Sequence, residues 1–159
     1  MTYRTGIGYD VHRFAKGRKL MLGGIEVAHD RGLEGHSDAD VLLHAICDAL
    51  LGAVGQGDIG EHFPPSDKSY KDIASSLLLK KVNTIVSDAG FQVVNVDVVV
   101  LAEEPHLKDY KAKMRKHISA LLNVDEMRVN IKATTNESLG FIGKKEGIAA
   151  YATVLVVRK

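Results

Sequence analysis

Polar and apolar residues alternate loosely over residues 3–12, a period typical of a β-strand. Gly6 and Gly8 interrupt the alternation. A glycine inside a strand often marks a place where another backbone or a ligand comes close. We therefore expect an N-terminal strand with a closely packed neighbour.

A second pattern follows at residues 20–27, where two short apolar runs flank Gly23 and Gly24. Paired glycines permit the positive φ angles of a two-residue turn, so this segment predicts a β-hairpin. Residues 28–35 are polar and contain glycine, and we expect a loop there.

The first helix is indicated by apolar residues at a spacing of three and four. Ser37 and Asp40 resemble a capping box, which places the helix N-terminus at Ser37. The glycine-rich run 52–57 should end the helix. The apolar stripe consists of Val41, Leu42, Ala45, Ile46, Ala49 and Leu50.

Helical spacing returns twice in the second half of the chain. One stripe begins at Ile73 and stops at Gly90, and another follows Pro105, a residue suited to the first turn of a helix. The segments typical of strands are 91–101, 129–133 and 148–157. The segments 58–69 and 136–147 lack periodicity and are expected to be loops, which often carry function when they are long.

This order of elements predicts an α+β fold, a single-domain α/β sandwich with one mixed sheet and helices packed on one face. The 159 residues suit one domain, residues 1–159. Hydrophobic residues make up 45% of the chain and charged residues 26%, as in soluble globular proteins. The net charge of +1 argues against a broad nucleic-acid surface or a basic membrane-binding face.

Cysteine usage and hydropathy bear on the compartment. Cys47 is the one cysteine, so no internal disulfide can form and a reducing environment is expected. We find no signal-peptide pattern and no apolar run near the roughly 20 residues of a membrane span. These features predict a cytoplasmic protein.

Candidate chemistry centres on Asp10 and His12, which are two residues apart and share one face of the predicted strand. His44 falls away from the apolar stripe of the first helix and is a candidate third ligand. One carboxylate and two imidazoles would form a catalytic zinc site with an open fourth position. A solvated surface histidine at position 44 remains the alternative.

His36 and Ser37 precede the first helix, where free N–H groups and the helix dipole favour a phosphate. A purely structural cap at Ser37 is the alternative interpretation, and the two roles are compatible.

Five motifs now carry a resemblance to a known family. They are Gly8-Tyr9-Asp10-Val11-His12, His36-Ser37-Asp38-Ala39-Asp40, Gly57-Asp58-Ile59-Gly60, Lys132-Ala133-Thr134-Thr135-Asn136-Glu137 and Leu139-Gly140-Phe141. Together they resemble the 2-C-methyl-D-erythritol 2,4-cyclodiphosphate synthases of non-mevalonate isoprenoid biosynthesis. The resemblance runs from about residue 3 to the last strand.

The resemblance implies a homotrimeric phosphorus–oxygen lyase with active sites between subunits. Its substrate would be 4-diphosphocytidyl-2-C-methyl-D-erythritol 2-phosphate. The 2-phosphate of this molecule attacks its own β-phosphate, which gives the 2,4-cyclodiphosphate and CMP. Two metals would neutralise the developing charge and fix the in-line geometry, and no protein nucleophile is needed.

The resemblance also implies roles for individual residues. Asp10, His12 and His44 are implied to bind zinc, and Glu137 is implied to bind a second metal, magnesium or manganese, together with the substrate phosphates. His36 and Thr135 are implied to stabilise the transition state. The implied substrate-binding residues are Asp10, Val11, His12, His36, Ser37, Asp58, Ile59, Gly60, Phe63, Pro64, Pro65, Ser66, Asp67, Ala102, Glu103, Glu104, Pro105, His106, Leu107, Lys108, Thr134, Thr135, Asn136, Glu137, Phe141 and Lys144.

The sequence departs from the family pattern at a few positions outside the metal ligands: Pro65 in place of a frequent aspartate, His106-Leu107 in place of lysine and methionine, Asn136 in place of threonine, and Lys144 in place of arginine. Lysine in place of arginine would replace a bidentate contact with a point charge. Two other functions fit the ligand set: a metal-dependent nucleoside-diphosphate hydrolase, and a non-catalytic trimeric module that binds metal or nucleotide.

Overall fold

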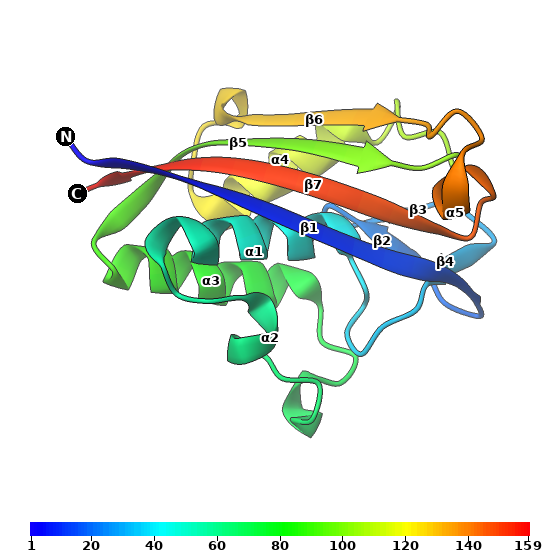
Figure 1. The fold of residues 1–159 in the computed structure, drawn as a ribbon, viewed down its shortest axis with the longest axis horizontal. Helices are drawn as coiled ribbons and strands as arrows, with labels where there is room; N and C mark the ends of the chain where they lie inside the picture. Colours follow the sequence, from blue (N-terminus) through cyan, green and yellow to red (C-terminus); the bar gives the residue numbers. More distant parts are fainter.

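The computed structural model describes all 159 residues and is built on one five-stranded sheet (Figure 1). The sheet has the order β4-β1-β7-β5-β6. Its strands are β1 (Tyr3–Lys16), β4 (Arg31–Leu33), β5 (Phe91–Leu101), β6 (Val129–Thr134) and β7 (Gly147–Arg158). The hairpin of β2 (Leu20–Leu22) and β3 (Ile25–Val27) forms as predicted but stays a separate two-stranded sheet.

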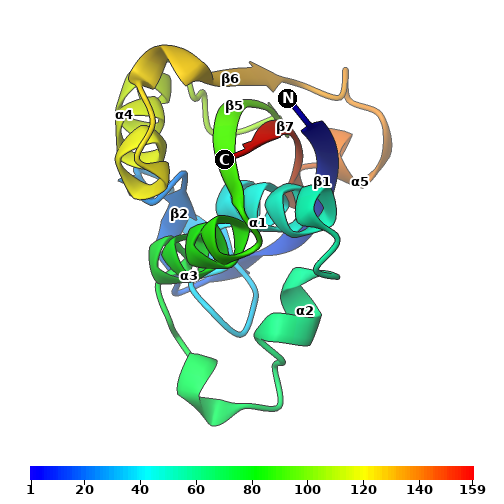
Figure 2. The same cartoon turned by 90° about the vertical axis from the view of Figure 1, so that its left-hand side faces the viewer.

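The helices lie mainly on one side of this sheet, as Figure 2 shows. They are α1 (Val41–Val54), α2 (Ile59–His62), α3 (Ser75–Asp88), α4 (Lys111–Leu122) and α5 (Gly140–Gly143), with short 3₁₀ turns at Lys68–Tyr70 and Glu126–Arg128. The β5–β6 pair is parallel, and α4 provides the crossover that a parallel pair requires. The remaining pairs in the sheet are antiparallel. The prediction of an α+β fold with a mixed sheet is therefore confirmed.

Helix α1 packs directly on β1 because two glycines leave room for its backbone. A Cβ placed on Gly6 would lie 1.9 Å from the carbonyl oxygen of Ala49, and one on Gly8 would lie 1.9 Å from that of Ala45. Both distances are far below any real contact, so only glycine fits here. The predicted close approach at these glycines is confirmed, and the partner is a helix.

The two faces of the sheet have different surroundings. Inward residues such as Val98, Val100 and Ala152 are completely buried under the helices. On the opposite face, large apolar side chains remain exposed: Ile7 (70%), Tyr9 (44%) and Tyr151 (42%). The two tyrosine rings lie side by side, with centroids 4.6 Å apart. One face of the sheet therefore forms the core, and the other presents apolar and aromatic surface.

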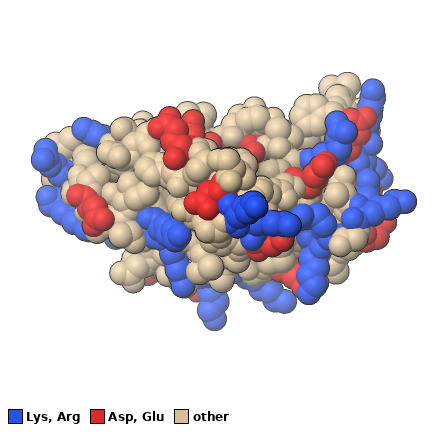
Figure 3. Space-filling model, turned by 90° about the horizontal axis from the view of Figure 1, so that it is seen from below, with Lys and Arg blue, Asp and Glu red and all other residues tan.

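Charges of both signs are scattered over the underside of the molecule (Figure 3). Lys and Arg gather toward the end that holds β4 and α5, where Asp and Glu lie among them. This mixed surface agrees with the net charge of +1. In addition, none of the helices is long and apolar enough to cross a membrane.

The start of α1 differs from the prediction. The cap is Asp40, whose carboxylate accepts from the N–H of Leu43, and the helix begins at Val41. Ala39 adopts a left-handed conformation with φ of 56°, so the chain turns sharply before the helix. Ser37 therefore lies upstream of the helix and accepts from the N–H of Ala39 instead. The expected capping box at Ser37 was wrong.

Other boundaries also differ from the sequence prediction. Pro105 does not open a helix: it follows a cis peptide bond, and α4 begins at Lys111. Three segments expected to be loops contain short elements, namely β4 in 28–35, α2 and the start of a 3₁₀ turn in 58–69, and α5 in 136–147. Each of these elements has only three or four residues, too few for a periodic pattern.

A candidate metal centre and its ligand cavity

Three side chains from β1 and α1 converge at the inner face of the sheet. Asp10 Oδ2 lies 2.9 Å from His12 Nε2 and 3.0 Å from His44 Nδ1. The two histidine nitrogens are 3.2 Å apart. The structure thus brings together the three residues that the sequence analysis grouped as one metal site.

The backbone explains why these side chains meet. Asp10 and His12 project from the same face of β1, because side chains two apart on a strand point the same way. His44 follows Leu43 in the first turn of α1, which rests on β1 through Gly8. The glycine contact therefore sets the distance between the strand ligands and the helix ligand.

Hydrogen bonds on the far side of each imidazole leave the inner nitrogens free for a metal. His12 Nδ1 lies 2.6 Å from the carbonyl oxygen of Glu34, so this nitrogen carries the proton and donates it. His44 Nε2 faces the hydroxyl oxygens of Ser75 at 2.9 Å and Ser37 at 3.1 Å. Ligand atoms of a tetrahedral zinc ion lie about 3.3 Å apart. A small outward shift of the three atoms therefore suits them to zinc.

The site is also electrostatically arranged for a cation. Burial alone would raise the pKa of Asp10, but hydrogen bonds to His12 and His44 outweigh it and lower the pKa to about 2. Burial lowers the pKa of His12, yet the hydrogen bond to Asp10 raises it above its ordinary value overall. A carboxylate that stays ionised beside two imidazoles is a good ligand set for a divalent cation.

A cavity of about 190 Å³ opens beside His12 and His44. His36 and Ser37 line it, so the predicted phosphate-facing residues do lie next to the metal triad. The other lining residues are Ile59, Gly60, Phe63, Pro65, Tyr70, Ile73 and Leu78. Tyr70, Ile73 and Leu78 were not predicted, because nothing in the sequence around them indicated a ligand site. The metal triad therefore has one side open to a ligand-sized space.

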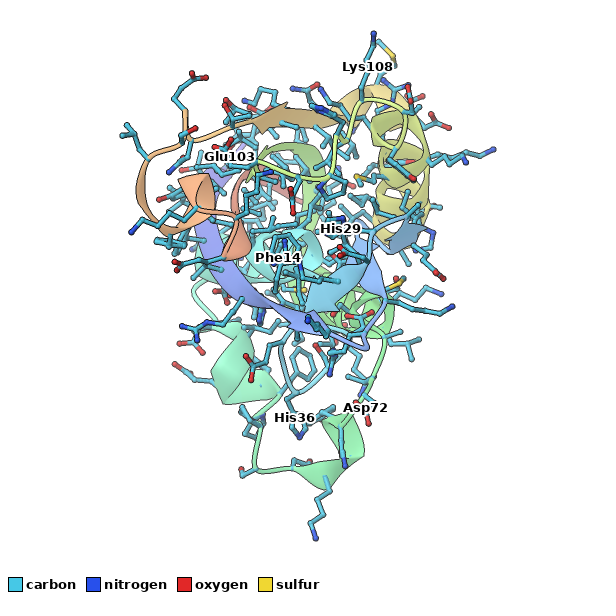
Figure 4. The ribbon with its side chains drawn as sticks, turned by 90° about the vertical axis from the view of Figure 1, so that its right-hand side faces the viewer. Phe14, His29, His36, Asp72, Glu103 and Lys108 are labelled. Carbon is cyan, nitrogen blue, oxygen red and sulfur yellow. The ribbon has the colours of Figure 1, made fainter.

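Residues 58–74 form the outer wall of this cavity and are tied to the rest of the fold. The N–H of Asp72 donates to the carbonyl of His36 at 2.8 Å, and Figure 4 shows the two residues close together. Phe63 and Tyr70 pack edge to face with ring centroids 5.3 Å apart. Asp58 caps α2 by accepting from the N–H of Glu61, which agrees with its structural interpretation. The predicted residues Pro65, Ser66 and Asp67 lie exposed at the rim.

A second group of predicted residues surrounds Glu137. Its carboxylate accepts from Thr135 Oγ1 at 3.0 Å, and the residue adopts a left-handed conformation with φ of 50°. Glu103 holds the backbone on either side, since its carboxylate accepts from the N–H of Asn136 at 2.8 Å and of Ser138 at 3.3 Å. Glu103 thereby joins the 102–108 segment to the loop that carries Glu137.

The 102–108 segment is fixed by charge and burial. Glu104 makes ion pairs with Arg31 Nη2 at 2.6 Å and Lys145 Nζ at 2.8 Å. The hydrogen bond to Lys145, and then that to Arg31, lower the pKa of Glu104. Leu107 is buried in the core, which leaves only its main chain for a ligand. Among the neighbouring predicted residues, Ala102 and Pro105 are half-buried, and His106 and Lys108 are exposed.

In one chain, the metal triad and the Glu137 group lie apart. The pairing register forms a row across the sheet, in which Val11 pairs with Ala149, Ala149 with Leu101, and Leu101 with Thr134. Strands about 4.8 Å apart place the ends of this row about 14 Å from each other. Figure 4 likewise shows Glu103 and His36 on opposite sides of the molecule, with Phe14 and His29 between them.

Phe141 and Lys144 lie at the same end as the Glu137 group, on and directly after α5. Both are exposed, and Phe141 lines a second cavity of about 230 Å³ together with Val11 and His12. The part of β1 that contains Val11 and His12 therefore lies next to the loop that precedes β7.

Two polar residues near the triad had no predicted role. Ser75 is completely buried and contacts His44, while Asp38 contacts Ser75. Asp38 lies inside a motif noted in the sequence, but its partner is 37 residues away, a contact that only the fold reveals.

Comparisons with known proteins agree with this geometry. A family profile described as the YgbB family matches residues 3–157. The 2-C-methyl-D-erythritol 2,4-cyclodiphosphate synthase of Syntrophomonas wolfei is 58% identical over 153 residues, which cover 96% of this chain and 98% of the relative. The protein of the same name from Prosthecochloris aestuarii is 53% identical over 156 residues, 98% of this chain and 99% of the relative.

Solved structures extend the comparison to the fold. IspF of Plasmodium falciparum in a CDP complex superposes with a TM-score of 0.86 at 33% identity, over 99% of this chain and 97% of that chain. The bifunctional IspDF of Campylobacter jejuni gives a TM-score of 0.96 at 46% identity over 99% of this chain, which spans 43% of that longer protein. Sequence, fold and the clustered ligands together show that the chain belongs to the YgbB family of 2-C-methyl-D-erythritol 2,4-cyclodiphosphate synthases.

Proposed function

We propose that this chain converts 4-diphosphocytidyl-2-C-methyl-D-erythritol 2-phosphate into 2-C-methyl-D-erythritol 2,4-cyclodiphosphate and CMP. The observation that carries the proposal is the Asp10–His12–His44 triad, which opens onto a cavity that also contains His36. Family membership supports the same reaction, because the relatives named above carry this activity in their names. We take the whole chain, residues 1–159, as one catalytic domain.

Asp10, His12 and His44 would hold a zinc ion through the three converging atoms, and Glu137 would hold a second divalent ion with the substrate phosphates. Bound metals supply Lewis-acid polarisation of the attacked phosphate and charge neutralisation between two phosphate groups that repel each other. The protein contributes a fixed geometry, since hydrogen bonds orient both histidines before a ligand arrives.

His36 and Thr135 would stabilise the transition state by donating hydrogen bonds to phosphate oxygens. His36 lines the cavity next to the triad, which suits it to the methylerythritol phosphate. Thr135 is tied to Glu137, the proposed ligand of the second metal. Preorganised donors of this kind act most strongly where charge develops in the reaction.

The separation of the two groups within one chain favours an active site shared between subunits of a homotrimer. One chain would provide the zinc triad and its cavity, and the neighbour would provide residues 102–108 and the Glu137 loop. The exposed apolar face with Ile7, Tyr9 and Tyr151 is a surface that assembly would cover. Light scattering should then give about three times the 17.3 kDa of one chain.

The reaction is tested by incubating the protein with the CDP substrate, zinc and magnesium. We expect CMP and a cyclic diphosphate in equal amounts. CMP with a linear, hydrolysed product would identify a metal-dependent hydrolase instead. The variants His36→Ala and Glu137→Gln should lose most activity while keeping the fold, and unchanged turnover in both would refute the proposed catalytic roles. A parent protein that binds metal but releases no CMP from the substrate would be a non-catalytic binding module.

A further inference from the structure

We propose that Ser75 and Asp38 form a hydrogen-bond relay that fixes the ring and the tautomer of His44, and so sets the affinity of the triad for zinc. The inference rests on the proposed function, because it concerns the same metal site. It gives both residues a positioning role, since neither lies among the converging ligand atoms.

The relay is continuous from the metal ligand to the carboxylate. His44 Nε2 lies 2.9 Å from Ser75 Oγ, and Ser75 Oγ lies 2.5 Å from Asp38 Oδ1. The N–H of Ser75 donates to the other carboxylate oxygen, Oδ2, at 3.0 Å. Asp38 therefore accepts hydrogen bonds from both the backbone N–H and the hydroxyl of Ser75, which fixes the orientation of the serine side chain.

The direction of each hydrogen bond follows from the chemistry of the groups. A metal at His44 Nδ1 requires the ring proton on Nε2, so Nε2 donates to Ser75. Ser75 then donates its own hydroxyl proton to the carboxylate oxygen Oδ1 of Asp38. The chain of donors is consistent only when Nδ1 holds the lone pair, which is the form that binds zinc.

Asp38 is itself held in place by the backbone. Its N–H donates to the carbonyl of Ile73 at 3.1 Å, and its Oδ1 accepts from the N–H of Asp40 at 3.1 Å. Ser75 is completely buried at the start of α3. The relay thus links His44 on α1 to the buried Ser75 on α3 and, through it, to the half-buried Asp38.

Ser37 is the competing partner, since its hydroxyl lies 3.1 Å from the same His44 nitrogen. Its oxygen already accepts from the N–H of Ala39, and no carboxylate receives its hydroxyl proton. Ser37 also lines the cavity, where a substrate phosphate would compete for it. Ser75 is therefore the acceptor that stays with His44 throughout the reaction.

The test measures zinc affinity directly, by competition with a chelator of known affinity, in the full-length protein. Ser75→Ala removes the acceptor, and we expect the zinc Kd to rise about 10- to 100-fold, the usual effect of losing such a partner. Asp38→Asn keeps the shape but can donate to Ser75, which reverses the relay toward the wrong tautomer, and the Kd should rise as well. Ser76→Ala is the matched control, because Ser76 contacts His117 from the same helix turn and should leave the Kd unchanged.

A second readout separates positioning from stability. In the zinc-loaded parent, NMR should detect a slowly exchanging His44 Nε2–H proton, which Ser75→Ala should lose. A Kd within about twofold of the parent in both Ser75→Ala and Asp38→Asn overturns the relay, even if both variants melt at a lower temperature. A parent that binds no zinc overturns the proposed metal site and the relay with it.

Discussion

Gly8 of β1 lies against Ala45 of α1 so closely that an added Cβ would fall 1.9 Å from the Ala45 carbonyl oxygen. Gly8→Ala should therefore force the helix away from the strand and lower the free energy of unfolding by about 3 kcal/mol or more. Urea denaturation followed by circular dichroism measures the change.

The matched control is Gly52→Ala in α1, the helix that packs on Gly8. Nothing lies within 4 Å of its would-be Cβ, and alanine is the better helix former. This variant should gain up to about 1 kcal/mol of stability. Equal stability of Gly8→Ala and the parent would contradict the close packing of α1 on β1.

His12→Ala should reduce bound zinc to nearly zero, because two remaining ligands hold a metal poorly. Metal analysis by mass spectrometry checks this after dialysis against a low zinc concentration. His117→Ala serves as the histidine control, since His117 contacts Ser76 outside the triad. Full zinc occupancy in His12→Ala would refute the proposed ligand set.

Asp40 predicts a defined pH dependence of stability. Burial, and to a smaller extent the charge of Asp38, raise the pKa of Asp40 to about 6. Hydrogen bonds from the backbone N–H groups of Gly24, Leu43 and Gly23 lower this pKa but do not outweigh burial. Its pKa in the unfolded chain is about 3.9. As pH rises, the unfolded chain therefore loses this proton first, and the contribution of the protonated group to stability is lost between about pH 4 and pH 6.

The measurement compares the parent with Asp40→Asn, which cannot titrate at this position. Over this pH range the free energy of unfolding should fall more in the parent than in the variant. A constant difference between the two proteins would show that Asp40 keeps the same protonation state in the folded and unfolded chains.

Mixed trimers test whether the active site is shared. His12→Ala and Glu137→Gln should each be inactive alone. In a cyclic trimer that contains both chains, about one site in three pairs an intact zinc triad with an intact Glu137 loop. Co-expression with two affinity tags should therefore recover partial activity. Complete inactivity of purified mixed trimers would place both groups of one site in the same chain.

Much of this fold could be predicted because long elements repeat a period many times. β1 was predicted from its alternation, β5 and β7 from residues typical of strands, and α1 from its apolar stripe. The same stripe argued against a core position for His44, which left metal ligation or a solvated surface position as its two interpretations, and the structure places it in the triad. Gly6 and Gly8 predicted close packing because glycine is costly inside a strand.

The errors have physical causes that a linear sequence does not display. Ser37 and Asp40 are both good capping residues, and the left-handed turn at Ala39 decides in favour of Asp40. Pro105 fits a first helical turn or an irregular loop equally well, and the fold selects the loop. The Ser75–Asp38 contact joins residues that are distant in sequence, so only tertiary packing could disclose it.

Successive residues of strand β1 point to opposite faces of the sheet and serve different surfaces. Asp10 and His12 face α1, whereas Tyr9 and Val11 face the exposed apolar surface. A slip of β1 by one residue would exchange the two sets and disable both surfaces at once. Metal binding and subunit assembly would thus both depend on the register of β1, so a molecule that shifts this strand would impair both.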